Sequence, residues 1–367
     1  PRSTPLYSSA ASDVYKRQAT TWSWTYERNK IMKRILSLLL ITLFIVSCED
    51  NGMNYSHADY LKMMAAINLD EMVGLDAIDD DGVQDEDYDE VLYDMDFTSS
   101  RIDPFPTDGS AVFRFGRKVE DRTRDVQFDC TDCDVAIATI TETHSGTFYA
   151  KAYNKETKEE IDSFEKAFSE TFVKQARLEK RDNAENPDGY VWGITGVSIG
   201  IGGSGSKLSV DEVRIYAPMD SDEAAYTLNA SDTNLIDREN MPKLAIGESF
   251  RVEVSVSNSD PILDFRGGEA VNLHIGKHKK HKARRGLRDG VQADDGTITY
   301  DNVFVRHLKV PRGAGSDSKH RRPLKMHFGA LDFGTMLDSD VDYHSSVLAF
   351  PFHVYNEGDD PRGTRGE

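Results

Sequence analysis

The stretch DVAIATITETHSGTFYAKAY, residues 134–153, decides how the first half of the chain folds. Its composition and length are typical of a long β-strand, and Ser145-Gly146 predicts a β-bulge within it. Further strands are predicted around it, with the turn-rich DNAENPDG ahead of the last one, at residues 123–128, 170–181 and 189–201. These strands are expected to form a strongly curved antiparallel sheet.

A helix is predicted ahead of this sheet, over residues 56–74. Ser56 suits its start as an N-cap, and Gly74 suits its end. Apolar residues recur between them at a spacing of three to four, namely Tyr60, Met63, Met64, Ile67 and Met72. A helix packed on a curved antiparallel sheet makes the expected fold class α+β for residues 56–205.

The order of these elements resembles the NTF2-like cone fold, with the segment FGRK at residues 115–118, a long bent strand and a tryptophan-bearing strand near the end. It is also similar to the leading half of uncharacterised lipoproteins from Bacteroidota. The resemblance implies a cone that can enclose an apolar pocket, as enzymes and binding proteins alike use. The candidate lining residues are Phe148, Tyr149, Tyr190 and Trp192, with plain core packing as the alternative.

The second half of the chain, residues 207–356, is predicted to be all-β. In SFRVEVSVS, apolar and polar residues alternate as in a sheet with one buried face, the apolar ones being Phe250, Val252, Val254 and Val256. Short strands separated by turns predict an immunoglobulin-like β-sandwich. The name describes architecture only, because the inter-sheet cysteine pair and buried tryptophan of antibody domains are absent from this region.

Between the two halves, residues 200–205 match the pattern G-x-G-x-x-G. A dinucleotide site needs a helix after that pattern, whereas the following KLSVDEVRIYA is typical of a strand. The segment is therefore interpreted as a flexible linker between domains.

The segment MKRILSLLLITLFIVSC, residues 32–48, has a short basic start and an apolar run too short to span a bilayer. It resembles the lipobox signal of bacterial lipoproteins, which implies that Cys48 is acylated and anchors the mature chain in membrane lipid. An ordinary secretory signal or an uncleaved anchor is the alternative. Residues 1–31 are expected to be non-native leader or adapter read-through, residues 49–55 a tether, and residues 357–367 a tail.

The acidic pair Glu49-Asp50 resembles the surface-export signal of Bacteroidota lipoproteins. An outer-membrane lipoprotein displayed on the cell surface is therefore expected, with the periplasmic face as the alternative. The net charge of −19 argues against general nucleic-acid binding, because a polyanion would be repelled.

Beyond Cys48, the remaining cysteines are Cys130 and Cys133 in C-T-D-C. A thioredoxin-type motif needs a βαβ context and a lowered thiol pKa, whereas this one lies between strands among aspartates. A small disulfide or a free thiol pair at a turn is expected instead.

A run of 11 acidic residues and no basic one extends from Asp76 to Asp96. With Gly82 as the loop glycine, an EF-hand would place alanine at position 1 and tyrosine at position 12, so a true EF-hand is excluded. A looser calcium site remains an alternative to a solvated acidic loop, and its ligands would be Asp76, Asp79, Asp81 and Asp85. No other cofactor is expected.

A basic segment with seven Lys or Arg residues interrupts the acidic chain: Lys277, Lys279, Lys280, Lys282, Arg284, Arg285 and Arg288. A second cluster spans residues 319–322. Such patches bind polyanions or acidic glycans, or else balance the acidic part of the chain. In a simple meander the two clusters would lie at opposite ends of the sandwich. A metal site at His274, His278 and His281 would need further ligands.

No G-x-S-x-G, H-E-x-x-H or P-loop pattern occurs, and His307, His327 and His353 lie in separate predicted strands. The expected function is therefore a non-enzymatic binding or structural module of the cell envelope, with an unknown envelope or extracellular partner. The alternatives are a polyanion binder acting through residues 277–288 and an enzyme using the cone pocket.

Overall fold

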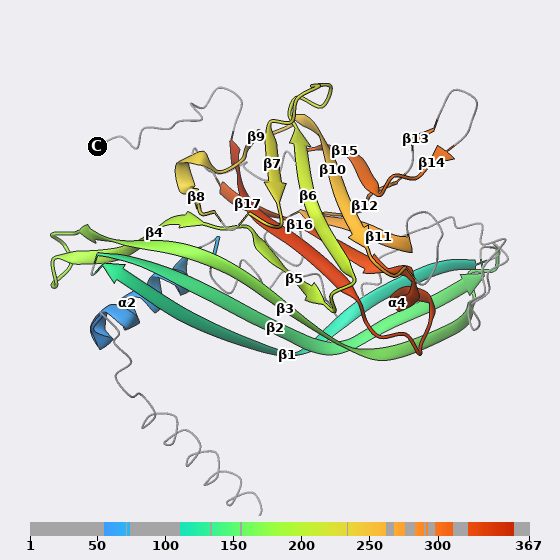
Figure 1. The fold of residues 1–367 in the computed structure, drawn as a ribbon, viewed down its shortest axis with the longest axis horizontal. Coiled ribbons are helices and arrows are strands. Elements are labelled where there is room, and N and C mark those ends of the chain that lie inside the picture. The colour runs from blue at the N-terminus through green and yellow to red at the C-terminus, as the bar shows by residue number, and fades with distance from the viewer. Residues whose placement is uncertain are drawn as a thin grey trace, which may run out of the picture. The chain divides into compact units, whose positions relative to one another are not determined.

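The structure is a computed structural model, and it describes residues 55–70, 72–73, 111–132, 134–154, 156–232, 234–261, 268–275, 283–289, 291–292, 298–310 and 322–355. These residues belong to one compact unit that begins at Asn54. Antiparallel strands dominate them, with few helices (Figure 1). The signal segment with Cys48, the tether up to residue 54, the acidic residues from Asp76 to Asp85 and the tail lie outside the described residues.

The predicted N-terminal helix is confirmed as α2 (His57–Leu69). The Ser56 hydroxyl accepts a hydrogen bond from the Asp59 amide at 3.1 Å, which satisfies one of the free N–H groups of the first turn. The helix ends earlier than Gly74, because Asp70 already has extended backbone angles. Met63 and Ile67 are fully buried on its inner face.

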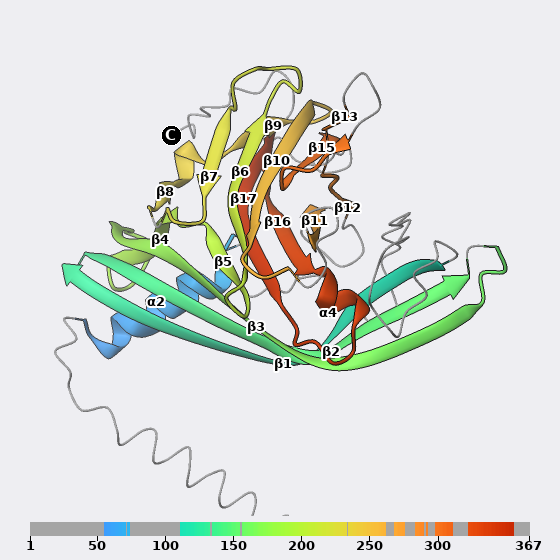
Figure 2. The same cartoon turned by 45° about the vertical axis from the view of Figure 1, so that its right-hand side comes forward.

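Three long strands run side by side: β1 (Ala111–Asp132), β2 (Val135–Asn154) and β3 (Glu160–Asp182). A β-bulge does occur beside Gly146, but its extra residue lies in β1, between Val119 and Asp121, and not at Ser145-Gly146 in β2 as predicted. A Cβ atom on Gly146 would lie 2.0 Å from the Lys118 carbonyl oxygen, so glycine is needed where the strands bend together. Figures 1 and 2 show the bend of all three strands.

The large sheet continues beyond β3, in the order β1-β2-β3-β5-β17-β16-β11-β12. Its further strands are β5 (Gly200–Ser204), β17 (Ser345–Tyr355), β16 (Arg322–Asp332), β11 (Glu269–Ile275) and β12 (Ala283–Gly286). Along its edges, β4 (Tyr190–Val197) pairs with β3 and β8 (Ile236–Asp237), and β9 (Lys243–Ala245) pairs with β17.

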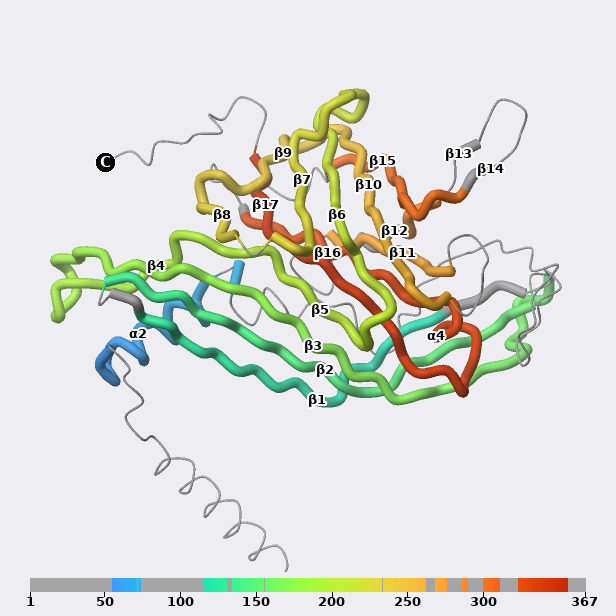
Figure 3. The backbone as a smooth tube through the Cα atoms, in the orientation of Figure 1, coloured from blue at the N-terminus to red at the C-terminus, as the bar shows by residue number. Residues whose placement is uncertain are grey.

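The glycine-rich segment 200–205 is therefore not a flexible linker, and that interpretation is wrong. Its residues form β5, which is hydrogen-bonded to β3 on one side and to β17 on the other (Figure 3). The glycines reflect crowding between two backbones, since a Cβ atom on Gly202 would lie 2.2 Å from the Thr171 carbonyl oxygen.

A second sheet of four strands has the order β15-β10-β6-β7. It consists of β6 (Leu208–Tyr216), β7 (Tyr226–Asn229), β10 (Ser249–Asn258) and β15 (Val303–Lys309). Its inward apolar residues share one core with residues of β11, β16 and β17, including Val252, Val254, Phe328 and Phe350. Two antiparallel sheets around a shared core fit a β-sandwich.

The smaller elements are a 3₁₀ helix, η1 (Arg238–Asn240), the hairpin of β13 (Val291–Gln292) and β14 (Ile298–Thr299), and a short helix, α4 (Phe333–Leu337). Asp332 caps α4 by accepting a hydrogen bond from the Gly334 amide at 2.8 Å.

The NTF2-like cone is not confirmed. The inner face of β1–β3 packs against α2 in one cluster and against residues of β16, α4 and β17 in the others, rather than against a layer of helices. The expected boundary at residues 205–207 falls between β5 and β6, yet the strands on both of its sides share one sheet through the pairing of β5 with β17. The two expected domains are thus joined by a continuous hydrogen-bonded sheet.

Candidate functional site

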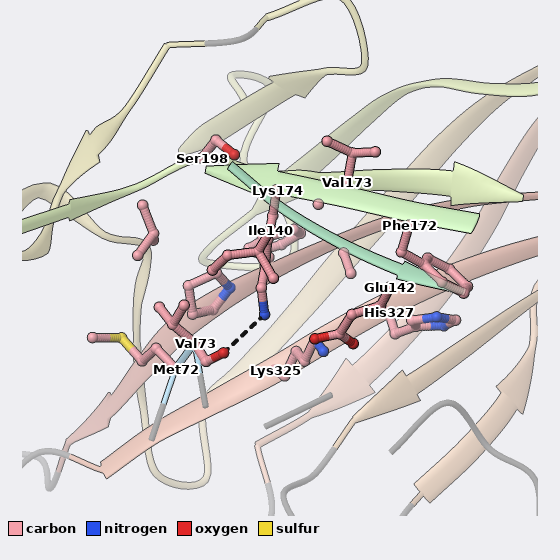
Figure 4. A pocket seen from close by; sticks show the side chains of 15 residues that line it. Met72, Val73, Ile140, Glu142, Phe172, Val173, Lys174, Ser198, Lys325 and His327 are labelled. Carbon is pink, nitrogen blue, oxygen red and sulfur yellow. Dashed lines mark hydrogen bonds between the residues drawn. The ribbon is translucent and has the colours of Figure 1, made fainter. Parts of the chain in front are cut away.

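A pocket opens where the inner face of β2 and β3 meets the face of β16 and β17 that points away from the sandwich core (Figure 4). Strand alternation decides which side chains reach it: Met326 and Phe328 point into the sandwich core, so Lys325 and His327 point into the pocket. Most of the lining is apolar, and it includes Ile140, Phe172, Val197, Ala349 and Pro351.

Four ionisable side chains lie among these apolar residues: Glu142, Lys174, Lys325 and His327 (Figure 4). Glu142 is only 4% exposed, and its carboxylate pairs with the Arg124 Nε at 3.2 Å. The Lys174 ammonium donates a hydrogen bond to the Val73 carbonyl at 3.1 Å. This bond holds Val73, which follows α2, beside the pocket. The pocket thus combines an apolar body with charged groups at defined positions.

A second, more polar pocket adjoins the first and shares His327 with it. Its central carboxylate, Glu170, accepts hydrogen bonds from the Tyr343 hydroxyl at 2.6 Å and the Ser345 hydroxyl at 2.7 Å, and it pairs with Arg117. Burial raises the pKa of Tyr343 well above its usual range, so this hydroxyl stays a donor. We call the two pockets together the cleft.

Four aromatic rings form a row, from His144 on β2, beside the cleft, through Phe172 on β3 and His327 on β16 to His274 on β11. Their ring centroids are separated by 5.4 Å (His144–Phe172), 6.2 Å (Phe172–His327) and 5.4 Å (His274–His327). His274 and His327 are cross-strand neighbours in register. The three predicted strand histidines do not gather, because His307 is exposed on β15 in the other sheet.

The four predicted pocket-lining aromatics lie elsewhere than the cleft. Phe148 is fully buried against Phe115 and Tyr343, as the core alternative expected. Tyr149 lies on the opposite face of β2, because neighbouring residues of a strand alternate between faces. Tyr190 and Trp192 hold α2, since both donate hydrogen bonds to Asp59, at 2.8 and 3.0 Å.

Sequence reasoning missed Glu142 and His144, although a signal was present. Both follow the same every-second-residue spacing as Ala138, Ile140 and Phe148, which are the buried residues of β2. Charged or titratable residues in phase with a buried strand face indicate a polar interior.

The predicted thiol pair and calcium site stay predictions. Cys133 lies outside the described residues, and the buried Cys130 thiol donates to the Val135 carbonyl at 3.6 Å. The calcium candidates also lie outside them, and among the residues that are described no group of three or more His, Cys, Asp or Glu could hold a metal ion.

The register places the attachment points of the two basic clusters at one end of the sheet. Residues 277–282 follow Ile275, the last residue of β11, and residues 319–321 precede Arg322, the first residue of β16. Ile275 pairs with Met326, and the two strands are antiparallel. The expected placement at opposite ends of the sandwich is therefore wrong for the strand ends. Arg288 is exposed, and the side chains of Arg284 and Arg285 and residues Lys277 to Lys282 lie outside the described part of the chain.

Comparison with protein-family models finds no match. Comparison with curated proteins finds none either. Within the described residues, no helix has the length and apolar character needed to cross a membrane.

Proposed function

We propose that this chain is a lipid-anchored protein of the bacterial outer membrane, displayed at the cell surface, that binds a small ligand in the cleft without transforming it. The anchor is supported by the basic start, the short apolar run and the small residue before Cys48 in residues 32–48. Several acyl chains on one cysteine would hold the protein stably, since a single chain gives only marginal membrane binding.

Replacing Cys48 with alanine is expected to remove the anchor. In a host that processes lipoproteins, the parent chain should begin at an acylated Cys48 and partition with membranes, whereas Cys48→Ala should carry no acyl mass and lose acyl-dependent partitioning. Intact-mass measurement and detergent-phase partitioning check both points. A soluble parent chain, or one that begins elsewhere, would contradict the anchor, and protection from protease added to intact cells would contradict surface display.

Ligand binding is supported by the cleft itself, in which Glu142 and His327 lie beside the apolar side chains of Ile140 and Phe172. Pockets for small molecules are concave and mostly apolar, with a few fixed polar groups that orient the ligand. The open space is small, about 40 Å³ in the apolar pocket and about 50 Å³ in the polar one, so the proposed ligand is a molecule of a few heavy atoms with an apolar part and one polar or charged group.

Filling the apolar pocket from β5 should abolish binding. A Cβ atom on Gly200 would have its nearest neighbour at 3.6 Å, so Gly200→Leu can extend into the pocket without a backbone clash. We expect it to weaken the binding of a small apolar anion, propanoate, by at least about tenfold in an NMR titration. Gly193→Leu is the matched control, because Gly193 has its nearest neighbour at 3.7 Å and lies outside the cleft.

Equal propanoate binding by Gly200→Leu and the parent would show that the cleft is not the site. Enzymatic use of the cleft and polyanion binding through residues 277–288 remain alternatives. The first is favoured by a buried carboxylate at the pocket, Glu142. The second is favoured by the shared end of β11 and β16 to which the two basic clusters attach.

A further inference from the structure

Helix α2 directs its charged side chains toward the protein. Asp59 accepts hydrogen bonds from Tyr190 and Trp192 of β4, and these bonds, together with that from Ser56, lower its pKa to about 2 although burial alone would raise it. The Lys62 ammonium lies 2.6 Å from Asp188 and 3.8 Å above the Tyr190 ring. Asp59 and Lys62 are the only charged residues of the helix, and both make their contacts on the side that faces the protein.

The outer face of the same helix is apolar or uncharged. Its exposed residues fall at helical spacing on one stripe: His57, Ala58, Leu61, Ala65, Asn68 and Leu69. Leu61 is 55% exposed and Leu69 is 83% exposed, the two highest values among the large apolar side chains of the described residues. The inner face is apolar as expected, with Met63 and Ile67 fully buried, but an ordinary surface helix would carry charged residues on its outer face.

We propose that the outer stripe of α2, centred on Leu61, Ala65 and Leu69, lies on the lipid surface of the membrane. The short segment between Cys48 and the helix would keep the stripe close to the membrane. Only seven residues, 49–55, separate Cys48 from Ser56, and a chain of that length spans at most about 25 Å. The inference rests on the proposed acyl anchor for this tether, and on the described residues for the stripe.

A membrane explains the chemistry of the stripe better than a polar partner does. An interfacial helix inserts an apolar face into the boundary between headgroups and acyl chains, and the gain scales with the apolar area removed from water. Because the stripe carries no charged side chain, its affinity should not depend on ionic strength. Contact through the basic residues 277–288 would instead weaken steeply with salt.

Tryptophan quenching in vesicles tests the proposal on the acylated full-length protein. Leu69→Trp, reconstituted in vesicles of brominated phosphatidylcholine, is expected to lose at least about half of the added fluorescence. Ile161→Trp is the control, since Ile161 is also an exposed apolar residue, at 46%, but lies on β3. Of the three tryptophans, Trp22 and Trp24 precede Cys48, so the background in the protein processed at Cys48 is Trp192, which is buried. The quenching of Leu69→Trp should be the same at low and at high salt.

The outcomes separate the stripe from the anchor. If intact mass shows acylation while Leu69→Trp is quenched no more than Ile161→Trp, the anchor stands and the stripe proposal is overturned. Finding another protein segment over the stripe would overturn it as well. If no acyl group is found, the anchor fails, and flotation of that unacylated protein with phosphatidylcholine vesicles tests the stripe alone. Leu61→Gln with Leu69→Gln should then lower partitioning by at least about tenfold, and unchanged flotation would contradict the proposal.

Discussion

Replacing Gly203 with alanine is expected to lower the free energy of unfolding by about 3 kcal/mol or more. Gly203 has a φ angle of +142°, and an added Cβ atom would lie 2.1 Å from the Ser345 carbonyl oxygen. The clash is with backbone and not with the end of a flexible side chain, so β5 must move away from β17. The substitution therefore disrupts β5, the strand that connects the long strands to the rest of the large sheet.

Urea denaturation followed by circular dichroism measures this loss. Gly116→Ala is the control, because a Cβ atom there meets no heavy atom within 4 Å. It should change the stability by no more than about 0.5 kcal/mol. Similar denaturation midpoints for the two variants would mean that β5 is not held between two backbones as described.

Replacing Glu269 with glutamine is expected to stabilise the protein at neutral and mildly alkaline pH. Glu269 is 1% exposed and is the cross-strand neighbour of Asp332, which is fully buried. The Asn258 amide donates to Asp332 at 2.9 Å, while the Lys207 ammonium lies 3.2 Å from the same carboxylate. Burial is the main cause that raises the pKa of Glu269 to about 8, and the charges of Asp289 and Asp332 add to it.

The direction of the pH dependence follows from proton binding. Above a pH of about 4.5 the unfolded chain has released the Glu269 proton, whereas the folded protein keeps it until about pH 8. The unfolded state binds fewer protons in this window, so the stability falls as the pH rises, by up to about 1.4 kcal/mol per pH unit. Below the window both states are protonated and this loss is absent.

Denaturation midpoints at several pH values between 4 and 9 test the prediction. Glu269→Gln should remove most of the downward slope, and its advantage over the parent should grow with pH. Glu165→Gln, at an exposed position on β3, is the control and should leave the slope unchanged. If the stability of the parent and that of Glu269→Gln rise alike between pH 5 and 8, Glu269 is not buried and protonated as described.

Several features of the fold could be predicted from local sequence. Ser56 and the apolar spacing after it predicted α2, and Ser145-Gly146 marked the place of a bulge whose extra residue lies in the partner strand β1. The alternation in residues 249–257 predicted β10 and its buried face. Each of these features depends on neighbours within one element, or on one hydrogen-bonded pair of strands, so the sequence pattern carries it.

The cleft was not predicted, although the phase of Glu142 and His144 within the strand already indicated that they face inward. The residues that complete the cleft come from far along the chain: His327 lies against Phe172, and Tyr343 donates to Glu170 across 173 positions. A sequence shows which side chains face inward, but not which strand stands opposite them, and the ligand class depends on the second fact.

By itself, the sequence determined which of the segments named above become strands or helix and which of their faces are buried, because backbone sterics and hydrophobic periodicity act over a few residues. The tertiary structure alone decided that β5 is a central strand and not a linker, and that the ends of β11 and β16 next to the basic clusters lie at the same end of the sheet. It also decided that α2 turns its charges inward and its leucines outward. These facts depend on strand order and on packing between distant segments, which local patterns do not encode.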